Sequence, residues 1–170
     1  MNLEKYIENV PNFPKEGIQF KDITPLIADG KAFRYTIETM ADFAKKVNAD
    51  LIVGPDARGF IFGAPVAALL GIGFVPVRKP GKLPRETLTE SYKLEYGENA
   101  LSIHKGDIKK GQNVLIVDDL LATGGTINAT IKLIEKSGAN VVGLSFLIEL
   151  IELNGKEAIK DYTIQSLLKY

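Results

Sequence analysis

The sequence contains no cysteine and no tryptophan, and only one histidine, among its 170 residues. Without cysteine the chain can form no disulfide, no thiolate zinc site and no cysteine nucleophile. A single histidine likewise excludes a metal centre built from several histidines. Lysine and arginine total 21 and aspartate and glutamate total 21, so the chain carries no formal net charge. Such a balance gives little counterion release on a phosphate backbone, and we expect no nucleic-acid partner.

Long uninterrupted apolar runs are also scarce. The stretch 59–77 has no charged residue, but Pro65, Gly71, Gly73 and Pro76 interrupt it, which favours a buried helix and strand over a membrane span. The first residues are polar and lack the features of a signal peptide. We therefore expect no membrane partner and a cytoplasmic globular protein, since 45% of the residues are hydrophobic and can build a core.

Segments with helix and strand patterns alternate along the chain. Apolar residues at three- and four-residue spacing predict helices over 31–47 and 64–70, and a further helix through Ile127, Ile131 and Ile134. Short aliphatic runs predict strands at 50–54, 74–77, 114–117 and 141–148. This order is typical of an α/β fold with a doubly wound, mostly parallel sheet.

Two regions fall outside this alternation. Prolines and a glycine before residue 30 predict irregular structure that forms a small N-terminal hood over 1–30. The region 79–105 begins with turn formers and charges and continues with two alternating segments, which predicts a flexible loop and a solvent-facing hairpin containing His104 away from the chemistry. The last segment, 152–170, predicts a helix and a strand, and we expect one domain over 1–170.

The run 114–126, VLIVDDLLATGGT, carries the most information about function. Ligands of open α/β sheets bind beyond the carboxyl ends of the strands, where Asp118 and Asp119 are expected to emerge. The residues 123–126 would open a helix, and the free N–H groups of a helix N-terminus bind phosphate. Two carboxylates can accept hydrogen bonds from a sugar diol or hold a hydrated Mg²⁺. The run therefore predicts a site for a phosphorylated sugar.

Other interpretations of this run are less consistent with its residues. No lysine follows the glycines, so the run is not a P-loop, and its spacing is not that of a dinucleotide-binding loop. Two aspartates and two glycines alone would favour a strand end and a tight turn. The complete thirteen-residue run favours the ligand site instead.

This run resembles the phosphoribosyl-pyrophosphate signature of the type I phosphoribosyltransferases. The segments 13–14, 20–25, 56–60, 77–84 and 94–97 narrow the resemblance to the members that use adenine. The resemblance extends over nearly the whole chain, in the order and approximate spacing of the family. It implies the family's fold, Mg²⁺ as cofactor and a homodimer.

The resemblance also implies a role for each matching residue. Asp118 and Asp119 would bind the ribose hydroxyls. The 5′-phosphate would lie against Ala122, Thr123, Gly124, Gly125 and Thr126. The pyrophosphate would contact Asp56, Ala57 and Arg58, in a loop that often holds a non-proline cis peptide in this family, and also Arg78, Lys79 and Lys82. Without the resemblance, the last three would be interpreted as a solvated basic turn. Adenine would lie between Phe20 and Leu120, with backbone groups near Gln19 and Arg58 at its edge.

The implied reaction transfers the 5-phosphoribosyl group from phosphoribosyl pyrophosphate to N9 of adenine, giving AMP and pyrophosphate in purine salvage. Glu95 is the family's candidate for proton transfer, with Tyr96 beside it, and Arg58 and Mg²⁺ would stabilise the leaving group. A carboxylate in an exposed hairpin can also be merely solvated, so the role of Glu95 stays open. Two alternatives stay open as well: a non-catalytic sensor of phosphoribosyl pyrophosphate, and a transferase for another base. Ala122 argues against 6-oxopurines, because members that use them carry aspartate there.

Overall fold

The computed structural model describes residues 1–93 and 97–170, which form two compact units, 1–39 and 40–170. The first unit begins with a single turn, η1 (Leu3–Tyr6), and an antiparallel pair of strands, β1 (Glu8–Pro11) and β2 (Gln19–Asp22). The prediction of irregular structure here was only partly right, because β1 and β2 pair in antiparallel register between stretches of turn and loop. The short helix α1 (Thr24–Ala28) follows, and then α2 (Gly30–Lys46), which continues into the second unit.

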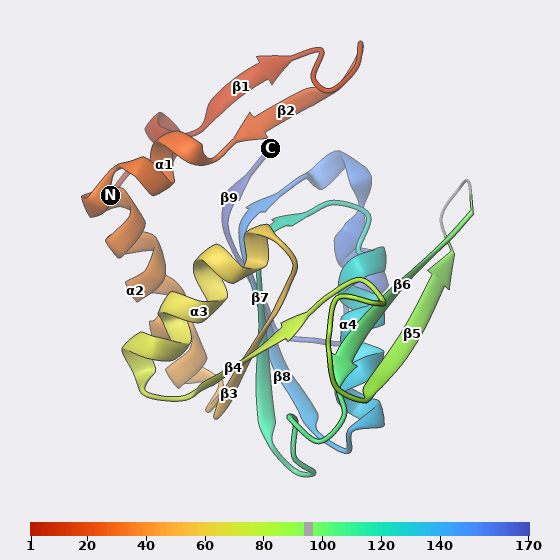
Figure 1. The fold of residues 1–170 in the computed structure, drawn as a ribbon. Coiled ribbons are helices and arrows are strands. Elements are labelled where there is room, and N and C mark those ends of the chain that lie inside the picture. Colours follow the sequence, from red (N-terminus) through yellow and green to blue (C-terminus); the bar gives the residue numbers. More distant parts are fainter. Residues whose placement is uncertain (94–96) are drawn as a thin grey trace. The chain divides into compact units, whose positions relative to one another are not determined.

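The second unit is built on a five-stranded sheet in the order β4-β3-β7-β8-β9 (Figure 1). Its strands span Gly73–Val77, Leu51–Pro55, Asn113–Leu121, Asn140–Glu149 and Ile164–Lys169, in that order. Every neighbouring pair is parallel, which confirms the predicted doubly wound fold. Strand β7 extends four residues beyond the predicted end at Val117, because its pairing with β8 continues to Leu121.

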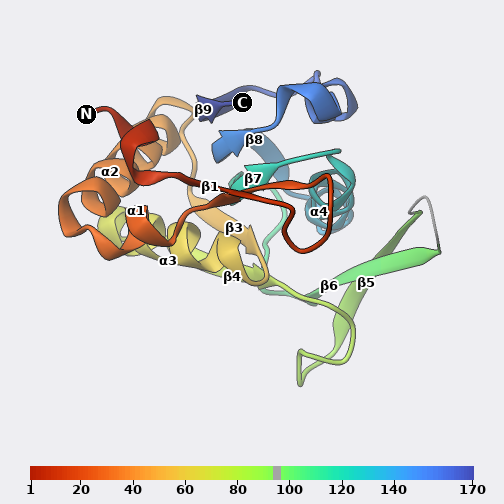
Figure 2. The ribbon, with the colours of Figure 1, turned by 90° about the horizontal axis from the view of Figure 1, so that it is seen from above.

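Two helices lie on opposite sides of this sheet, as the view in Figure 2 shows. Helix α3 (Arg58–Leu70) packs on one side and begins six residues before the predicted start. Helix α4 (Gly125–Lys136) buries Ile127, Ile131 and Ile134 against the other side, as the sequence pattern predicted. Over the described parts of the chain, no helix combines the length and the apolar character that crossing a membrane requires.

The hairpin consists of β5 (Thr87–Lys93) and β6 (Glu98–His104), paired in antiparallel register. The prediction of a solvent-facing hairpin was only partly right. Leu101 and Ile103 of β6 are buried in the same core as α4, since the hairpin packs on that helix. The segment predicted as a helix near residue 152 instead forms two short 3₁₀ turns, η2 (Ile151–Leu153) and η3 (Gly155–Ile159), before β9.

Candidate active site

A cavity of about 390 Å³ opens at the carboxyl ends of β3 and β7. Its walls are two segments far apart in sequence, 55–58 after β3 and 118–127 from the end of β7 into α4. This is the edge of a parallel sheet at which ligands of open α/β folds bind. The structure therefore brings together the two segments that the family resemblance assigned to pyrophosphate and to ribose phosphate.

The two carboxylates in this cavity lie in contrasting surroundings. Asp119 is 5% exposed and its Oδ2 lies 2.8 Å from Nε of Arg58, so the two side chains form an ion pair. The backbone N–H of Asp119 donates to Oδ1 of Asp118 over 2.9 Å. Both aspartates belong to the last part of β7 rather than to a loop after it. Regular strand structure thus fixes the position of the acidic pair.

Burial and mutual repulsion alter the acidity of this pair. Burial raises the pKa of Asp118 well above its ordinary value, and the neighbouring charge of Asp119 raises it further. Burial also raises the pKa of Asp119, while the Arg58 guanidinium acts in the opposite direction. The site therefore holds negative charge at a cost, which a ligand with hydrogen-bond donors or a cation would relieve.

The loop after β3 approaches this pair closely. The peptide bond between Asp56 and Ala57 is cis, a geometry that the sequence alone left open. Gly59 follows in the first turn of α3, where a Cβ atom would lie 3.0 Å from Oδ1 of Asp118 and 2.9 Å from Pro55. A side chain at this position would force the helix away from the acidic pair. Glycine lets Arg58 come near enough to pair with Asp119.

The Thr-Gly-Gly-Thr segment forms the N-terminus of α4, as predicted. Gly124 caps the helix with a left-handed backbone, φ 86°, and Gly125 is the first helical residue. The first N–H groups of a helix have no acceptor within the helix, and its dipole favours an anion there. No acidic side chain lies in the first turn of α4 to compete for this position. The segment thus has the features of a phosphate site.

One contributor to this loop was missed by the sequence interpretation. Gly155, the first residue of η3, is buried behind the loop, and a Cβ atom there would overlap with the carbonyl oxygen of Ala122. In the opposite direction, a Cβ on Gly124 would lie 2.7 Å from the carbonyl oxygen of Gly155. The two glycines therefore allow backbone to pack directly on backbone. A lone glycine 29 residues beyond the loop's end, at Thr126, carries no sequence signal for this contact.

The basic residues after β4 are held beside the Asp56 loop. Nε of Arg78 lies 3.1 Å from Oδ2 of Asp56, and its Nη1 donates to the carbonyl oxygen of Lys82 over 3.4 Å. Lys79 and Lys82 lie in an exposed turn that their own backbone hydrogen bond closes. Arg78 is thus placed against the predicted pyrophosphate loop, and its two basic neighbours follow it.

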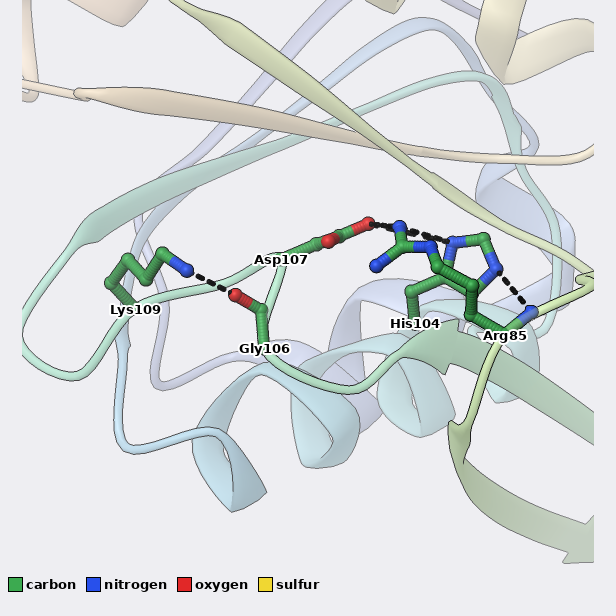
Figure 3. Close-up of polar contacts among 5 residues, drawn as sticks. All are labelled: Arg85, His104, Gly106, Asp107 and Lys109. Atoms are coloured by element: carbon green, nitrogen blue, oxygen red, sulfur yellow. Dashed lines mark hydrogen bonds and ion pairs between the residues drawn. The ribbon is translucent and has the colours of Figure 1, made fainter.

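The far end of this basic loop is tied to the hairpin, as Figure 3 shows. The backbone N–H of Arg85 donates to Nε2 of His104 over 3.3 Å, and Nη2 of Arg85 lies 3.0 Å from Nδ1 of the same ring. Nη2 also donates to Asp107 over 2.8 Å, which lowers the pKa of that carboxyl. His104 does lie in the hairpin as predicted, where it joins the loop to β6.

Several predicted residues cannot be placed in this cavity. Glu95 and Tyr96 lie outside the described residues. Gln19 and Phe20 belong to the first unit, in β2, whereas Leu120 belongs to the second unit and lines the cavity. The adenine position between Phe20 and Leu120 therefore stays a prediction.

Comparison with known proteins identifies the family of this chain. Residues 27–169 match the model of the phosphoribosyl transferase domain. The chain belongs to that family. Its relatives place it among the adenine phosphoribosyltransferases: one from Clostridium botulinum is 58% identical over 170 residues, covering 100% of this chain and 99% of the relative.

Solved structures of the same enzymes share the fold. Adenine phosphoribosyltransferase from Thermoanaerobacter pseudethanolicus is 55% identical, with a TM-score of 0.95 over 99% of this chain and 98% of that one. The Saccharomyces cerevisiae enzyme, solved with adenine and an imino-altritol bisphosphate, is 39% identical, with a TM-score of 0.92 over 97% and 96% of the two chains. The similarity thus extends over both units and is not confined to the sugar-phosphate run.

Proposed function

We propose that this protein transfers the 5-phosphoribosyl group of phosphoribosyl pyrophosphate to N9 of adenine, releasing pyrophosphate and forming AMP. The observation that carries the proposal is one cavity lined both by the loop at Asp56 and by the segment that runs from the acidic pair at the end of β7 into α4. The yeast relative was solved with adenine, which supports the same base for this chain. The similarity to adenine phosphoribosyltransferases over the full length supports the whole reaction.

The acidic pair would bind the ribose. A carboxylate accepts hydrogen bonds from two neighbouring hydroxyls, which orients the sugar ring in the cavity. Asp119 is already held by Arg58 at 2.8 Å, whereas Asp118 is partly exposed beside it. The negative charge of the pair also stabilises positive charge that develops at the anomeric carbon as the bond to pyrophosphate breaks.

Anionic groups would occupy the two ends of the cavity. The residues from Ala122 to Thr126 would bind the 5′-phosphate with backbone N–H groups and two threonine hydroxyls. The pyrophosphate would lie against Asp56, Ala57 and Arg58, with Arg78, Lys79 and Lys82 adding positive charge. Cations preorganised at this end stabilise the charge that accumulates on the leaving group.

Magnesium fits this site as a partner of the substrate. No group of three or more aspartate, glutamate or histidine side chains that could hold a metal ion occurs in residues 1–93 and 97–170, so this part of the chain offers no complete cage. The acidic pair can contact the water shell of Mg²⁺ while pyrophosphate oxygens supply further ligands. Bound there, the ion would neutralise charge on the departing pyrophosphate.

The base and the proton complete the proposal. Adenine would stack between Phe20 and Leu120, with backbone groups near Gln19 reading its edge. Glu95 would act in proton transfer at adenine, with Tyr96 next to it in the sequence. We further propose a cytoplasmic homodimer, which the family resemblance suggests.

The deciding experiment measures AMP and pyrophosphate formation from phosphoribosyl pyrophosphate and Mg²⁺ with adenine, hypoxanthine, guanine, xanthine or orotate. We expect product with adenine only. Product with another base alone would replace adenine in the proposal. No product with any base, combined with tight binding of the donor, would overturn the enzyme and indicate a sensor.

A further inference from the structure

The hairpin is attached to helix α4 at two levels. In the C-terminal half of the helix, the carboxylate of Glu90 on β5 pairs with Lys136, the last residue of α4, and its Oε1 lies 3.9 Å from Nζ of Lys132. The Glu90 side chain is only 15% exposed, so water screens these pairs incompletely. Two residues further along β5, Tyr92 reaches the N-terminus of the same helix. One strand therefore contacts both the body of α4 and its predicted phosphate-binding end.

Tyr92 contacts the phosphate loop in two ways. Its hydroxyl oxygen lies 3.4 Å from the hydroxyl oxygen of Thr126, the last residue of the Thr-Gly-Gly-Thr segment. Its ring covers Gly125, since a Cβ atom on that glycine would lie 3.5 Å from the ring carbon Cδ2. The ring is also packed against the core beneath the hairpin. Tyr92 is thus held in place by packing and presents its hydroxyl to the loop.

A threonine hydroxyl has one proton and can accept at its lone pairs. When the phenol of Tyr92 donates to Thr126, the threonine proton is free to point toward an anion in the loop. Hydrogen bonds in such a chain polarise one another, so the Thr126 hydroxyl becomes a better donor. Without the phenol, that proton has no preferred direction and the loop also loses an anchor.

We propose that Tyr92 is a positioning residue for the sugar phosphate: it orients the Thr126 hydroxyl toward the 5′-phosphate and links the hairpin to the phosphate loop. The proposal rests on the function proposed above, because it takes 122–126 as the phosphate site. Tyr92 does not touch the reacting atoms. It acts through Thr126, and its effect should therefore appear in binding of the phosphate rather than of the base.

The test compares Tyr92→Phe with the unmodified protein by calorimetric titration with ribose 5-phosphate and by steady-state kinetics. The substitution keeps the ring over Gly125 and removes only the hydroxyl. We expect ribose 5-phosphate binding to weaken by about twofold to threefold, the low end for one hydrogen bond, because 3.4 Å is a long separation for two hydroxyl oxygens. The KM for phosphoribosyl pyrophosphate should rise by a similar factor, with the KM for adenine unchanged.

Two further variants separate positioning from general damage. Tyr162→Phe is the matched control, because the Tyr162 hydroxyl donates to Glu135 near the other end of α4. It should bind ribose 5-phosphate as the unmodified protein does. In a Thr126→Val background, Tyr92→Phe should have no additional effect, because its acceptor is gone.

The outcomes distinguish this inference from the proposed function. If the Tyr92→Phe variant binds ribose 5-phosphate as tightly as the unmodified protein, the positioning role is wrong. It is also wrong if Tyr92→Phe weakens this binding by the same factor in the Thr126→Val background as in the unmodified protein. If the unmodified protein does not bind ribose 5-phosphate, both the loop assignment and this inference fail. If it binds ribose 5-phosphate but forms no AMP, the proposed reaction fails while the Tyr92 result still decides the inference.

Discussion

The two loops to which the proposal assigns anionic groups, one lining the cavity and one beside the Asp56 loop, are built in different ways. The phosphate loop, residues 122–126, rests on the backbone of Gly155 and leads into α4. The basic loop, residues 78–85, is exposed over most of its length and is tied by ion pairs at its two ends, Arg78 to Asp56 and Arg85 to Asp107. Backbone packing fixes the geometry of a loop at ordinary salt concentration and pH. Partly exposed ion pairs contribute little to the stability of a loop, and salt screens them. We infer that the phosphate loop is a rigid site for the ribose 5-phosphate part of the donor, which is retained in the product. The basic loop is an adjustable site for the pyrophosphate, which leaves.

The largest expected effect comes from the acidic pair between these regions. Asp118→Asn keeps the shape and removes the charge that would hold the ribose. We expect kcat/KM to fall roughly 10- to 100-fold, as for loss of a hydrogen bond to a charged group. Steady-state kinetics measures this loss, and unchanged kcat/KM would remove Asp118 from the site.

The same variant should be more stable than the unmodified protein, and the gain should depend on pH. The pKa of Asp118 is raised in the folded state, so the folded protein retains a proton that the unfolded chain loses. Stability therefore falls as the pH rises from the ordinary aspartate pKa toward the raised one. Asparagine does not titrate, so the stability of the Asp118→Asn variant lacks this decline. The difference in melting temperature should grow as the pH rises above about 4, and a constant difference would contradict a raised pKa for Asp118.

Gly155→Ala tests the phosphate loop through its contact with the backbone of Gly155. The new methyl group would overlap with the Ala122 carbonyl oxygen and push the phosphate loop out of position. Overpacking of this kind predicts a KM for phosphoribosyl pyrophosphate raised by about tenfold, with a lower melting temperature. Gly30→Ala is the matched control, because a Cβ there would meet nothing within 4 Å. A normal KM in Gly155→Ala would show that the contact does not shape the loop.

Arg85→Ala tests the adjustable region and should have a smaller effect. It removes the contacts to His104 and Asp107 that hold the far end of the basic loop. The Arg85 side chain is 59% exposed, so we expect at most about a threefold rise in the dissociation constant for pyrophosphate. Raising the salt concentration should reduce the difference between Arg85→Ala and the unmodified protein. A larger loss of pyrophosphate affinity, unchanged by salt, would mean that the basic loop is as rigid as the phosphate loop.

The smallest effect should follow from Lys132→Ala. Its Nζ lies 3.9 Å from Glu90, which also pairs with Lys136, so one partner remains for the hairpin. We expect kinetic constants within about twofold of the unmodified protein. Loss of activity in steady-state assays would show that each of the Glu90 ion pairs is required.

Much of this arrangement could be predicted from the sequence, because its signals are local. The strand run before Asp118 and the glycines after it define the phosphate segment and its place at a sheet edge. The extension of β7 to Leu121 depends on its register with β8, which no local pattern encodes. The packing of Gly155 behind Ala122 and the bond from Tyr92 to Thr126 are contacts between distant segments. Composition and periodicity contain no information about such contacts.

The most direct test of this account measures ribose 5-phosphate and pyrophosphate binding separately, by calorimetry, in the unmodified protein, Gly155→Ala and Arg85→Ala. We predict a crossed result. Gly155→Ala should weaken ribose 5-phosphate by about tenfold and leave pyrophosphate nearly unchanged, whereas Arg85→Ala should weaken only pyrophosphate, by at most about threefold. Equal weakening of both ligands by either variant, or the reverse pattern, would contradict two separately built anion sites.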